Sequence, residues 1–559
     1  MEDIITTGVC VVGAGPVGLS TALELGRRGI PCLLIDQGEG VIDHPRGTGV
    51  SVRTMEYFRR WGLADEIRRG YSGTLPLNQI FCSSMSGYEF AIARYPTLDD
   101  TPLPPTSPEH VQRCSQNWWD ATIAGAVKRQ PSVELRYETR YEHLESNGGQ
   151  GVTAVVTDLR TGTTARVHCR YLVACDGVNS RIRQELGLIR EGDTVVDYRM
   201  SILFHVEDLI GKLGREPGER FIILVPDGAR GNVTSIDGHD VWRLLVRGMG
   251  DRFDLDTFDP AAYVRAALGR DDIDFTVRSV MPWRNARWVA SRYRVGNVFL
   301  AGDSAHSMPP SGGFGANTGI SDAMNLSWKL VANLQGWGGE PLLDSYEHER
   351  KPTAQRNAAY ATTNTLNWTP DGPLAAAFDD TPESAAIRAE LGEQLIAATR
   401  AEWESLGVSL GYRYSDSPIC VPDGTPEPTD DPIVYVPTSR PGSRAPHAWL
   451  DDGRSTLDLF LDSFTLVRLR DDADVEPLVD TAGRRGIPLD VVDIRQDDIA
   501  QLYDRALILV RPDGHVAWRS DTVDLDADKL LDIVCGAGSG DRPGVARVVE
   551  DVDTRNPGG

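Results

Sequence analysis

The chain has 559 residues, which exceeds what one hydrophobic core organises and predicts roughly two to four domains. With 41% hydrophobic and 25% charged residues, the composition is that of an ordinary folded globular protein. The formal net charge of -24 makes nucleic acid an unfavourable partner.

The sequence predicts neither export nor membrane anchoring. No apolar run approaches the roughly 20 residues that a membrane helix needs, and the acidic start, MEDIITTGVC, enters a strand pattern at once. The 8 cysteines show no CxxC or other metal-ligand spacing. We therefore expect a cytoplasmic protein with no membrane association, no metal site and buried free thiols.

The first segment carries the pattern of a dinucleotide-binding unit. An apolar strand is followed by GAGPVGLSTALELGRRG, in which Gly13, Gly15 and Gly18 form a GxGxxG turn before a helix. Gly13 would make the tight turn, Gly15 would let the backbone approach a pyrophosphate, and Gly18 would allow close helix packing. A second apolar strand ends in Asp36, an acceptor for ribose hydroxyls that favours FAD or NAD over NADP.

The next segments place polar residues around two predicted helices. HPRGTGVSVRTMEYFRRWGL, residues 44–63, passes from a loop that contains Arg46 into a helix. Arg113 and Gln116 precede a second helix, and after a strand hairpin the chain returns to an apolar strand that ends at Asp176. Arginines in such patterns are mostly solvated or paired charges, although a Gly/Pro loop is a place where arginines often meet ligands.

Another apolar strand ends at Asp303 and is followed by two prolines and a glycine-rich loop up to Gly319. Glycines before a helix let a planar or phosphorylated ligand approach backbone N–H groups, but the same composition is typical of a surface loop. Three predicted strand ends thus carry acids, at Asp36, Asp176 and Asp303. Ligands of a parallel sheet bind at the carboxyl ends of its strands, so we expect these acids to converge on one cofactor.

The remaining patterns predict three further parts. Between Asp176 and Asp303 lie strand patterns without glycine fingerprints, which indicate an inserted, mainly antiparallel sheet: MSILFHV (200–206), FIILV (221–225) and VWRLLVRG (241–248). Long helical stretches and a proline-rich span, 418–446, follow. From about Trp449 onward, strand, helix, strand and hairpin patterns indicate a separate α/β unit, and without a CxxC pair we expect no redox chemistry from it.

With GAGPVGLS, CDGVNSRIRQ and AGDSAHSMPPSGGFGANTG in this order, the chain resembles the class A flavoprotein monooxygenases, the FAD-dependent aromatic hydroxylases. LGYRYSDSP, DGTPEP, RPGSRAPHAWL and LVRPDGHVAWR resemble the phenol and 2,4-dichlorophenol hydroxylase subgroup. The resemblance implies an α/β protein with a Rossmann-like FAD-binding domain (1–80, 105–185 and 280–365), an inserted antiparallel-sheet substrate domain (81–104 and 186–279), a helical segment and linker (366–445) and a thioredoxin-like C-terminal domain lacking CxxC (446–559).

The resemblance also implies cofactor-binding residues. The first glycines would hold the FAD pyrophosphate and Asp36 the ribose, Asp176 belongs to a motif linked to both FAD and NAD(P)H, and Asp303 would hold the ribityl chain. Two departures are Ser304 in place of alanine and Asp120 in place of glutamate. The complete predicted set is Gly13, Gly15, Pro16, Val17, Gly18, Asp36, Gln37, Arg46, Arg113, Gln116, Asp176, Gly302, Asp303, Pro310, Gly313, Ala316 and Asn317.

The implied activity is hydroxylation of a phenol or related small aromatic substrate by O2 through a flavin C4a-hydroperoxide, with NAD(P)H as a transient co-substrate. FAD supplies the oxygen chemistry, while the protein would supply a dry pocket and help to deprotonate the phenol. Our candidate catalytic residues are His44, Arg46, His205, Arg247 and Pro310. A lone histidine or arginine is more often structural than catalytic.

Three alternatives remain. One alternative with the same fold is a monooxygenase that acts on a polycyclic polyketide by hydroxylation or by a Baeyer–Villiger-type oxygen insertion. A halogenase is disfavoured because the WxWxIP motif is missing. Outside enzymes, the chain is a flavin-binding regulator or scaffold. We also expect a homo-oligomer, with the C-terminal unit serving assembly, and the residues do not distinguish NADH from NADPH.

Overall fold

The computed structural model describes residues 3–40, 42–149, 151–248, 253–254, 256–370, 372–523 and 526–537. The predicted C-terminal domain, 446–559, extends past this part of the chain, so its residues 538–559 lie outside the described residues. Among the described helices, none has the length and apolarity that crossing a membrane requires.

The N-terminal unit is built on a parallel sheet whose strands end at the same edge. The strands follow the order β17 (Val298–Leu300), β10 (Thr164–Ala174), β1 (Asp3–Val12), β2 (Cys32–Ile35) and β7 (Val133–Arg136). The register pairs Val12 with Ile35 and with Ala174, and Ala174 with Leu300. The residues that follow these strands therefore meet at one edge, as the sequence predicted.

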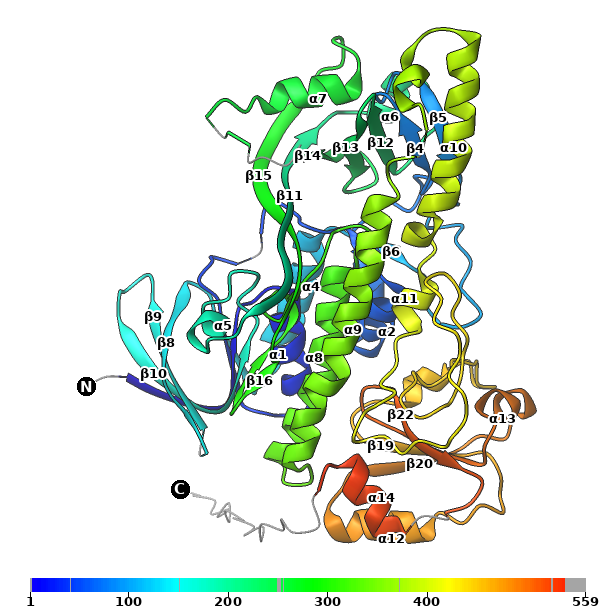
Figure 1. Ribbon diagram of the computed structural model, residues 1–559. Coiled ribbons are helices and arrows are strands. Elements are labelled where there is room, and N and C mark those ends of the chain that lie inside the picture. The colour runs from blue at the N-terminus through cyan, green and yellow to red at the C-terminus, as the bar shows by residue number, and fades with distance from the viewer. Residues whose placement is uncertain are drawn as a thin grey trace, which may run out of the picture.

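Two helices cover this sheet close to that edge. Helix α1 (Pro16–Arg27) begins with proline in its first turn, a position that needs no N–H donor, and it packs against α8 (Phe314–Leu334). Helix α9 (Glu340–Leu366) runs along α8 (Figure 1). The smaller elements of this unit are β3 (Gly49–Val50), α2 (Val52–Arg60), α3 (Ala64–Arg68), β6 (Gln112–Arg113), α4 (Gln116–Lys128), β8 (Thr139–Gly148), β9 (Gly151–Asp158), α5 (Arg181–Glu185), β16 (Arg294–Val295) and the 3-10 turn η1 (Gly302–Ser304).

The second sheet is mainly antiparallel, as predicted for the inserted segments. In order, its eight strands are β18 (His306–Ser307), β15 (Thr276–Ala290), β11 (Arg190–His205), β14 (Val241–Arg247), β13 (Gly228–Ser235), β12 (Arg220–Val225), β4 (Gln79–Cys82) and β5 (Glu89–Ala93). Its flanking helices are α6 (Leu209–Leu213), α7 (Pro260–Leu268) and α10 (Pro382–Trp403). The predicted mixed α/β architecture, with one parallel and one antiparallel sheet, is confirmed.

The two faces of the antiparallel sheet differ in chemistry. Along β11, Met200, Ile202 and Phe204 lie in an apolar core with the residues of α7, whereas Ser201 and His205 alternate onto the opposite face. Strand β14 repeats the pattern, with apolar Trp242, Leu244 and Val246 in the same core and Arg243, Leu245 and Arg247 on the other side. The opposite face therefore presents polar and charged groups toward the parallel-sheet unit.

The C-terminal unit has the strand, helix, strand and hairpin order that the sequence predicted. Its sheet runs β20 (Leu489–Asp493), β19 (Phe464–Arg468), β21 (Leu507–Val510) and β22 (Val516–Ser520), with helices α12 (Glu476–Arg485), α13 (Asp497–Tyr503) and α14 (Ala527–Val534). The chain reaches it through α11 (Leu406–Leu410) and an extended span. Trp328 and Trp337 pack into its core from the α8 side, so the unit docks on its own chain, and a role in assembling further copies stays a prediction.

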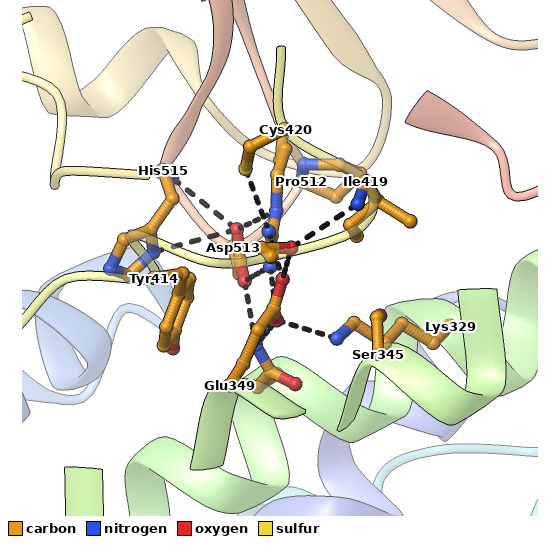
Figure 2. A network of polar contacts seen from close by, with 12 residues as sticks. Lys329, Ser345, Glu349, Tyr414, Ile419, Cys420, Pro512, Asp513 and His515 are labelled. Carbon is orange, nitrogen blue, oxygen red and sulfur yellow. Dashed lines mark hydrogen bonds and ion pairs between the residues drawn. The ribbon is translucent and has the colours of Figure 1, made fainter. Parts of the chain in front are cut away.

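A buried group of charges lies where this unit meets α8 and α9. Glu349 of α9 accepts hydrogen bonds from both terminal nitrogens of Arg511 at 2.6 and 2.9 Å and from Lys329 Nζ at 2.6 Å. Arg511 also donates to Asp513 at 2.6 Å. Figure 2 shows Glu349 directed from its helix toward Asp513, with Lys329 beside it. The side chains of Lys329, Glu349 and Arg511 are fully buried, so the charges are compensated by each other and not by water.

This network predicts a specific acid sensitivity. Burial alone would raise the pKa of Glu349, but Arg511 and Lys329 outweigh it and bring the pKa to about 2. The stabilisation is therefore present above the ordinary value of 4.5 and is lost as the pH falls from there toward about 2. We expect Glu349→Gln to lower the free energy of unfolding near neutral pH by about 3–5 kcal/mol, the usual loss when one partner of a buried ion pair is removed.

Denaturant unfolding of wild type and variant at neutral pH and at about pH 3 measures this difference. The gap between the two proteins should shrink in acid, because below pH 4.5 the Glu349 carboxyl binds a proton in the unfolded wild type, and folding must then release that proton. The exposed Glu393→Gln substitution is the control and should change little. A gap of equal size at both pH values would contradict the assignment of the acid transition to Glu349.

Candidate functional site

The glycine turn after β1 is shaped by steric limits. Gly13 has a φ of 105°, and a Cβ atom there would overlap the Cys175 carbonyl oxygen. A Cβ at Gly18 would overlap the carbonyl oxygen of Gly13, so the first turn of α1 lies directly against the turn. A Cβ at Gly15, by contrast, would meet no protein atom within 4 Å. The turn thus leaves one open side at the start of α1, where the N–H groups and helix dipole favour an anionic group.

Asp36 connects this turn to the loop after β2. Its carboxylate accepts hydrogen bonds from Ala14 N and from Gly38 N, both at 2.7 Å. The side chain is half-buried, and the neighbouring Gln37 is exposed. Asp36 therefore lies beside the open side of the glycine turn, where a ribose next to a pyrophosphate would be placed.

The end of β17 brings a second acid to the same edge. Gly302, with a φ of 61°, turns the chain into η1, and Asp303 is open to the site. Although Asp303 is exposed, the atoms packed around its carboxyl partly desolvate it and raise its pKa, against the opposing effect of His306 and Arg46. The unexpected Ser304 donates to the carbonyl oxygen of Ala174 at 2.6 Å, which ties η1 to β10. An alanine could not make this bond.

Asp176, the third strand-end acid, is less accessible. One oxygen accepts a hydrogen bond from Ile182 N at 3.2 Å at the start of α5. The other oxygen is buried and has no hydrogen-bond partner among the described residues. Burial raises the pKa of this carboxyl. Asp176 thus has one free acceptor at the edge where the strands meet.

Asn317 fastens the glycine-rich loop to the N-terminal unit. Its Oδ1 accepts a hydrogen bond from Ser51 N at 3.0 Å, and its Nδ2 donates to the carbonyl oxygens of Gly49 at 3.1 Å and Gly313 at 2.7 Å. Gly313 has a φ of 67° and its N–H donates to the Pro310 carbonyl oxygen at 2.9 Å. The Asn317 side chain therefore positions two loops, and the backbone from Pro310 through Ala316 forms the surface of this part of the site.

Gln116 lies next to Arg46. Gln116 Oε1 accepts a hydrogen bond from Arg46 N at 3.3 Å, and Gln116 Nε2 donates to Asp120 at 3.2 Å. Burial raises the pKa of Asp120 to about 7. The Arg113 guanidinium donates to Glu219 at 2.7 Å, just before β12, and its contact with the dinucleotide stays a prediction. The ion pair links the two sheets.

His44 reaches from the N-terminal unit onto the polar face of the antiparallel sheet. Its ring nitrogens lie 2.7 Å from Ser279 Oγ and 2.8 Å from Ser201 Oγ. Burial, together with Arg243 and Arg46, lowers the pKa of His44 to about 4. The imidazole is thus neutral near pH 7 and acts as a hydrogen-bonding group and not as a strong base.

The other catalytic candidates share this face but not this position. His205 lies four residues beyond Ser201, about 13 Å along an extended strand. Arg247 is 3.5 Å from Asp197 in an ion pair, and burial and Arg199 lower its pKa. The structure therefore brings His44 and Arg46 together near the flavin-side loops and leaves Arg247 engaged with an acid of β11.

Four charged residues between the polar face of the antiparallel sheet and the glycine-rich loop were not predicted. Glu402 of α10 accepts hydrogen bonds from Gly312 N at 3.3 Å and Trp368 Nε1 at 2.5 Å, and lies 3.7 Å from Arg220. Arg243 donates to the Arg46 carbonyl oxygen at 3.1 Å. The missed residues are Glu219, Arg220, Arg243 and Glu402.

Positive charge is in excess among these residues. Burial, with Arg220 nearby, lowers the pKa of Arg243 to about 10. Burial raises the pKa of Glu402 to about 7, so this acid is only partly ionised near neutral pH. The Nε atoms of Arg220 and Arg243 are buried and lack hydrogen-bond partners among the described residues. We call Arg113, Arg220 and Arg243 the arginine cluster.

The donor set fits a flavin dinucleotide. The open side of Gly15, the acceptors at Asp36 and Asp303 and the backbone of the Pro310 to Ala316 loop lie along one edge of the parallel sheet. In the described residues, no group of three or more His, Cys, Asp or Glu side chains is placed to hold a metal ion.

The sequence matches two known families. Residues 6–361 match the family described as FAD binding domain, and residues 438–537 match the family described as Aromatic-ring hydroxylase, C-terminal. The first match contains the whole glycine turn, all three strand-end acids and the glycine-rich loop.

Relatives extend over nearly the whole chain. Tetracenomycin B2 monooxygenase-dioxygenase from Streptomyces olivaceus is 35% identical and covers 95% of this chain and 98% of its own length. The 4-methyl-5-nitrocatechol 5-monooxygenase from Burkholderia sp is 31% identical, with 94% and 96% covered. Among solved structures, the rebeccamycin biosynthetic enzyme RebC with reduced flavin is 37% identical, with a TM-score of 0.88 and coverage of 96% of this chain and 100% of that chain.

Two glycines of the first turn give a matched test of the cofactor site. Gly15 has a φ of -76° and open space beside it, so Gly15→Ala should leave the unfolding free energy of the apoprotein within about 0.5 kcal/mol of wild type. The added methyl should still lower FAD affinity by about tenfold or more, because it occupies the approach of the pyrophosphate. Gly18→Ala should instead destabilise the apoprotein by about 2 kcal/mol or more. Isothermal FAD titration and denaturant unfolding measure the pair, and unchanged FAD binding by a folded Gly15→Ala protein would reject the placement.

Proposed function

Because the chain belongs to the FAD-dependent aromatic hydroxylases, we propose that it hydroxylates a phenolic ring held between the glycine-rich loop and the arginine cluster. The protein is a flavin-dependent aromatic-ring monooxygenase, and NAD(P)H is the typical electron donor of its family. Bound FAD supplies electron transfer and oxygen activation. The proposal concerns the ring that accepts the oxygen and the residues that hold it.

The observation that carries this proposal is the uncompensated positive charge of the arginine cluster. Three guanidinium groups face Glu219 and a partly ionised Glu402. A phenol in water ionises with a pKa of about 10, and nearby positive charge favours its anionic form. Phenolate is the more electron-rich nucleophile, so stabilising it prepares the ring for attack on activated oxygen.

The remaining groups orient the ring and keep it dry. The polar face of the antiparallel sheet supplies the wall, and we propose that the inserted segments, 81–104 and 186–279, select the substrate. Neutral His44, fixed between Ser201 and Ser279, offers a hydrogen bond to the phenolic oxygen without adding charge. Through Gly312, Glu402 connects this wall to the loop that faces the flavin.

A second candidate is the same reaction on a phenolic ring within a polycyclic polyketide. The relative named tetracenomycin B2 monooxygenase-dioxygenase matches 98% of its own length, which favours this substrate class. The nitrocatechol monooxygenase, matched almost as fully, favours a single ring. A flavin-binding scaffold without activity is not supported, because both relatives are named as oxygenases over nearly the whole chain.

A substrate panel separates the two candidates. We expect NAD(P)H to reduce the bound flavin faster when a true substrate is present, and the product to gain one oxygen atom. Stopped-flow absorbance with mass spectrometry should be applied to monocyclic phenols and to phenolic polycycles at equal concentration. Product formation confined to the polycycles would select the second candidate. If no phenol of either class accelerates reduction or yields product, the phenolic-ring proposal fails.

The positive charge of the arginine cluster predicts a shift in the ionisation of the bound phenol. Arg243→Gln should raise the apparent pKa of the bound phenol by about one unit or more, because one compensating cation is lost. Phenolate absorbance during pH titration of the holoenzyme measures it. The exposed Arg292→Gln substitution is the control and should leave the value unchanged. Equal bound-phenol pKa values in wild type and Arg243→Gln would remove the arginine cluster from the mechanism.

A further inference from the structure

Asp322 is a fully buried acid of α8 that the catalytic proposal does not use. Its Oδ2 accepts hydrogen bonds from Gly302 N at 3.1 Å and from His306 Nε2 at 2.7 Å. Its Oδ1 accepts one from Arg350 Nε at 2.7 Å. Burial would raise the pKa of Asp322, but Arg350 and His306 outweigh it and lower the pKa, so the carboxylate stays ionised.

The Gly302 contact matters because Gly302 directly precedes Asp303. Gly302 holds a φ of 61°, and a Cβ there would lie 2.7 Å from a methyl group of Val17. The start of η1 is therefore confined against α1, and the Asp322 carboxylate accepts a hydrogen bond from the Gly302 N–H group. This N–H group belongs to the peptide that leads into the Gly302–Asp303 turn, so its hydrogen bond restricts the orientation of the backbone directly before Asp303. Asp322 thus contacts the residue that precedes Asp303.

Arg350 extends this contact toward the C-terminal unit. Besides Asp322, it donates to the Thr318 carbonyl oxygen at 3.1 Å and to the Tyr414 hydroxyl at 3.2 Å. The Tyr414 ring lies 4.3 Å from the His515 ring, centroid to centroid, and the Arg511 guanidinium carbon lies 5.1 Å from its centroid. Both partners of Tyr414 belong to the turn between β21 and β22. Figure 2 shows Tyr414 beside His515 at this junction.

A second connection runs along the same helix. Asn325 follows Asp322 by three residues, which places both on one face of α8. Its amide donates to Glu349 at 2.7 Å and to Asp513 at 3.3 Å. Glu349 precedes Arg350 in α9 and binds Arg511. One face of α8 is therefore held at two points by the β21–β22 turn.

We propose that Asp322 is a positioning residue for FAD and that the C-terminal unit, through Tyr414 and Arg350, keeps it in place. Asp322 fixes the Gly302–Asp303 turn, so Asp303, the predicted ribityl ligand, is oriented before FAD binds. This inference rests on FAD binding and is independent of the proposed phenolic substrate.

The test must separate positioning from general stability. Asp322→Asn keeps the size of the side chain but removes the charge that holds both Arg350 and His306. Tyr414→Phe removes only the hydroxyl that contacts Arg350. Asp423→Asn is the matched control, because Asp423 forms a part-buried ion pair with Arg519 at 2.6 Å, and its hydrogen-bond partners among the described residues, Thr425 and Arg519, lie outside α8 and α9.

The full-length apoproteins should be titrated with FAD by fluorescence, after circular dichroism has shown that each is folded at the titration temperature. We expect Asp322→Asn to raise the FAD dissociation constant by about tenfold or more, as for loss of hydrogen bonds to a charged group. Tyr414→Phe should raise it by about threefold. Asp423→Asn should lower the melting temperature and leave the FAD dissociation constant within about twofold of wild type.

Two results would overturn the proposal. One is wild-type FAD affinity in a folded Asp322→Asn protein. The other is a loss of affinity in Asp423→Asn as large as in Asp322→Asn, which would make the effect one of stability alone. If Asp322→Asn does not fold, Tyr414→Phe decides, and an affinity equal to wild type then rejects the link to the C-terminal unit. Because FAD binding is measured without substrate, failure of the phenol proposal would leave these results unaffected.

Discussion

The flavin site depends on the close approach of backbone turns that only glycine permits. Gly13 and Gly18 bring the start of α1 against the end of β1, and Gly302 and Gly319 bring η1 and α8 against Val17. Any Cβ at these points would overlap a neighbour, so the two helices and two strand ends form one rigid corner. This packing sets the positions of the acids at the strand ends.

Two buried groups of charge around this corner follow opposite rules. At the junction with the C-terminal unit, Glu349 is fully paired and its pKa falls to about 2. Beside the antiparallel sheet, Glu402 has incomplete compensation and its pKa rises to about 7. A network with balanced charges stabilises one arrangement of the chain. An unbalanced group of charges that is shielded from water favours the binding of a ligand of opposite charge. The electrostatics therefore distinguish the structural junction from the proposed substrate wall.

The sequence predicted the features that have a fixed period or a fixed local geometry. Apolar strands that end in Asp36, Asp176 and Asp303 specify a sheet edge, since strand ends and glycine turns are local. Arg243 was missed because the alternation in β14 separates two faces but does not indicate which face meets the glycine-rich loop. Glu402 was missed because the helical pattern around it does not indicate a contact with Gly312, which is distant in the sequence.

Long side chains and distant contacts set the remaining limit. The ion pair of Arg113 with Glu219 was not predicted, because spacing in the sequence determines where a side chain begins and not which partner its flexible end selects. The network around Glu349 joins this residue to Arg511, more than a hundred positions away, and no pattern near either residue predicts the contact.

The C-terminal unit shows why buried charge suits its attachment. Apolar packing at Trp328 and Trp337 favours contact but tolerates sliding, because hydrophobic attraction has no preferred direction. The guanidinium of Arg511 binds Glu349 through two parallel hydrogen bonds, and this geometry accepts one orientation. A unit without a CxxC pair is thus held in a defined direction against α8 and α9. The same face of α8 carries Asp322 three residues before Asn325, so the contacts that orient the C-terminal unit lie next to the contact with Gly302.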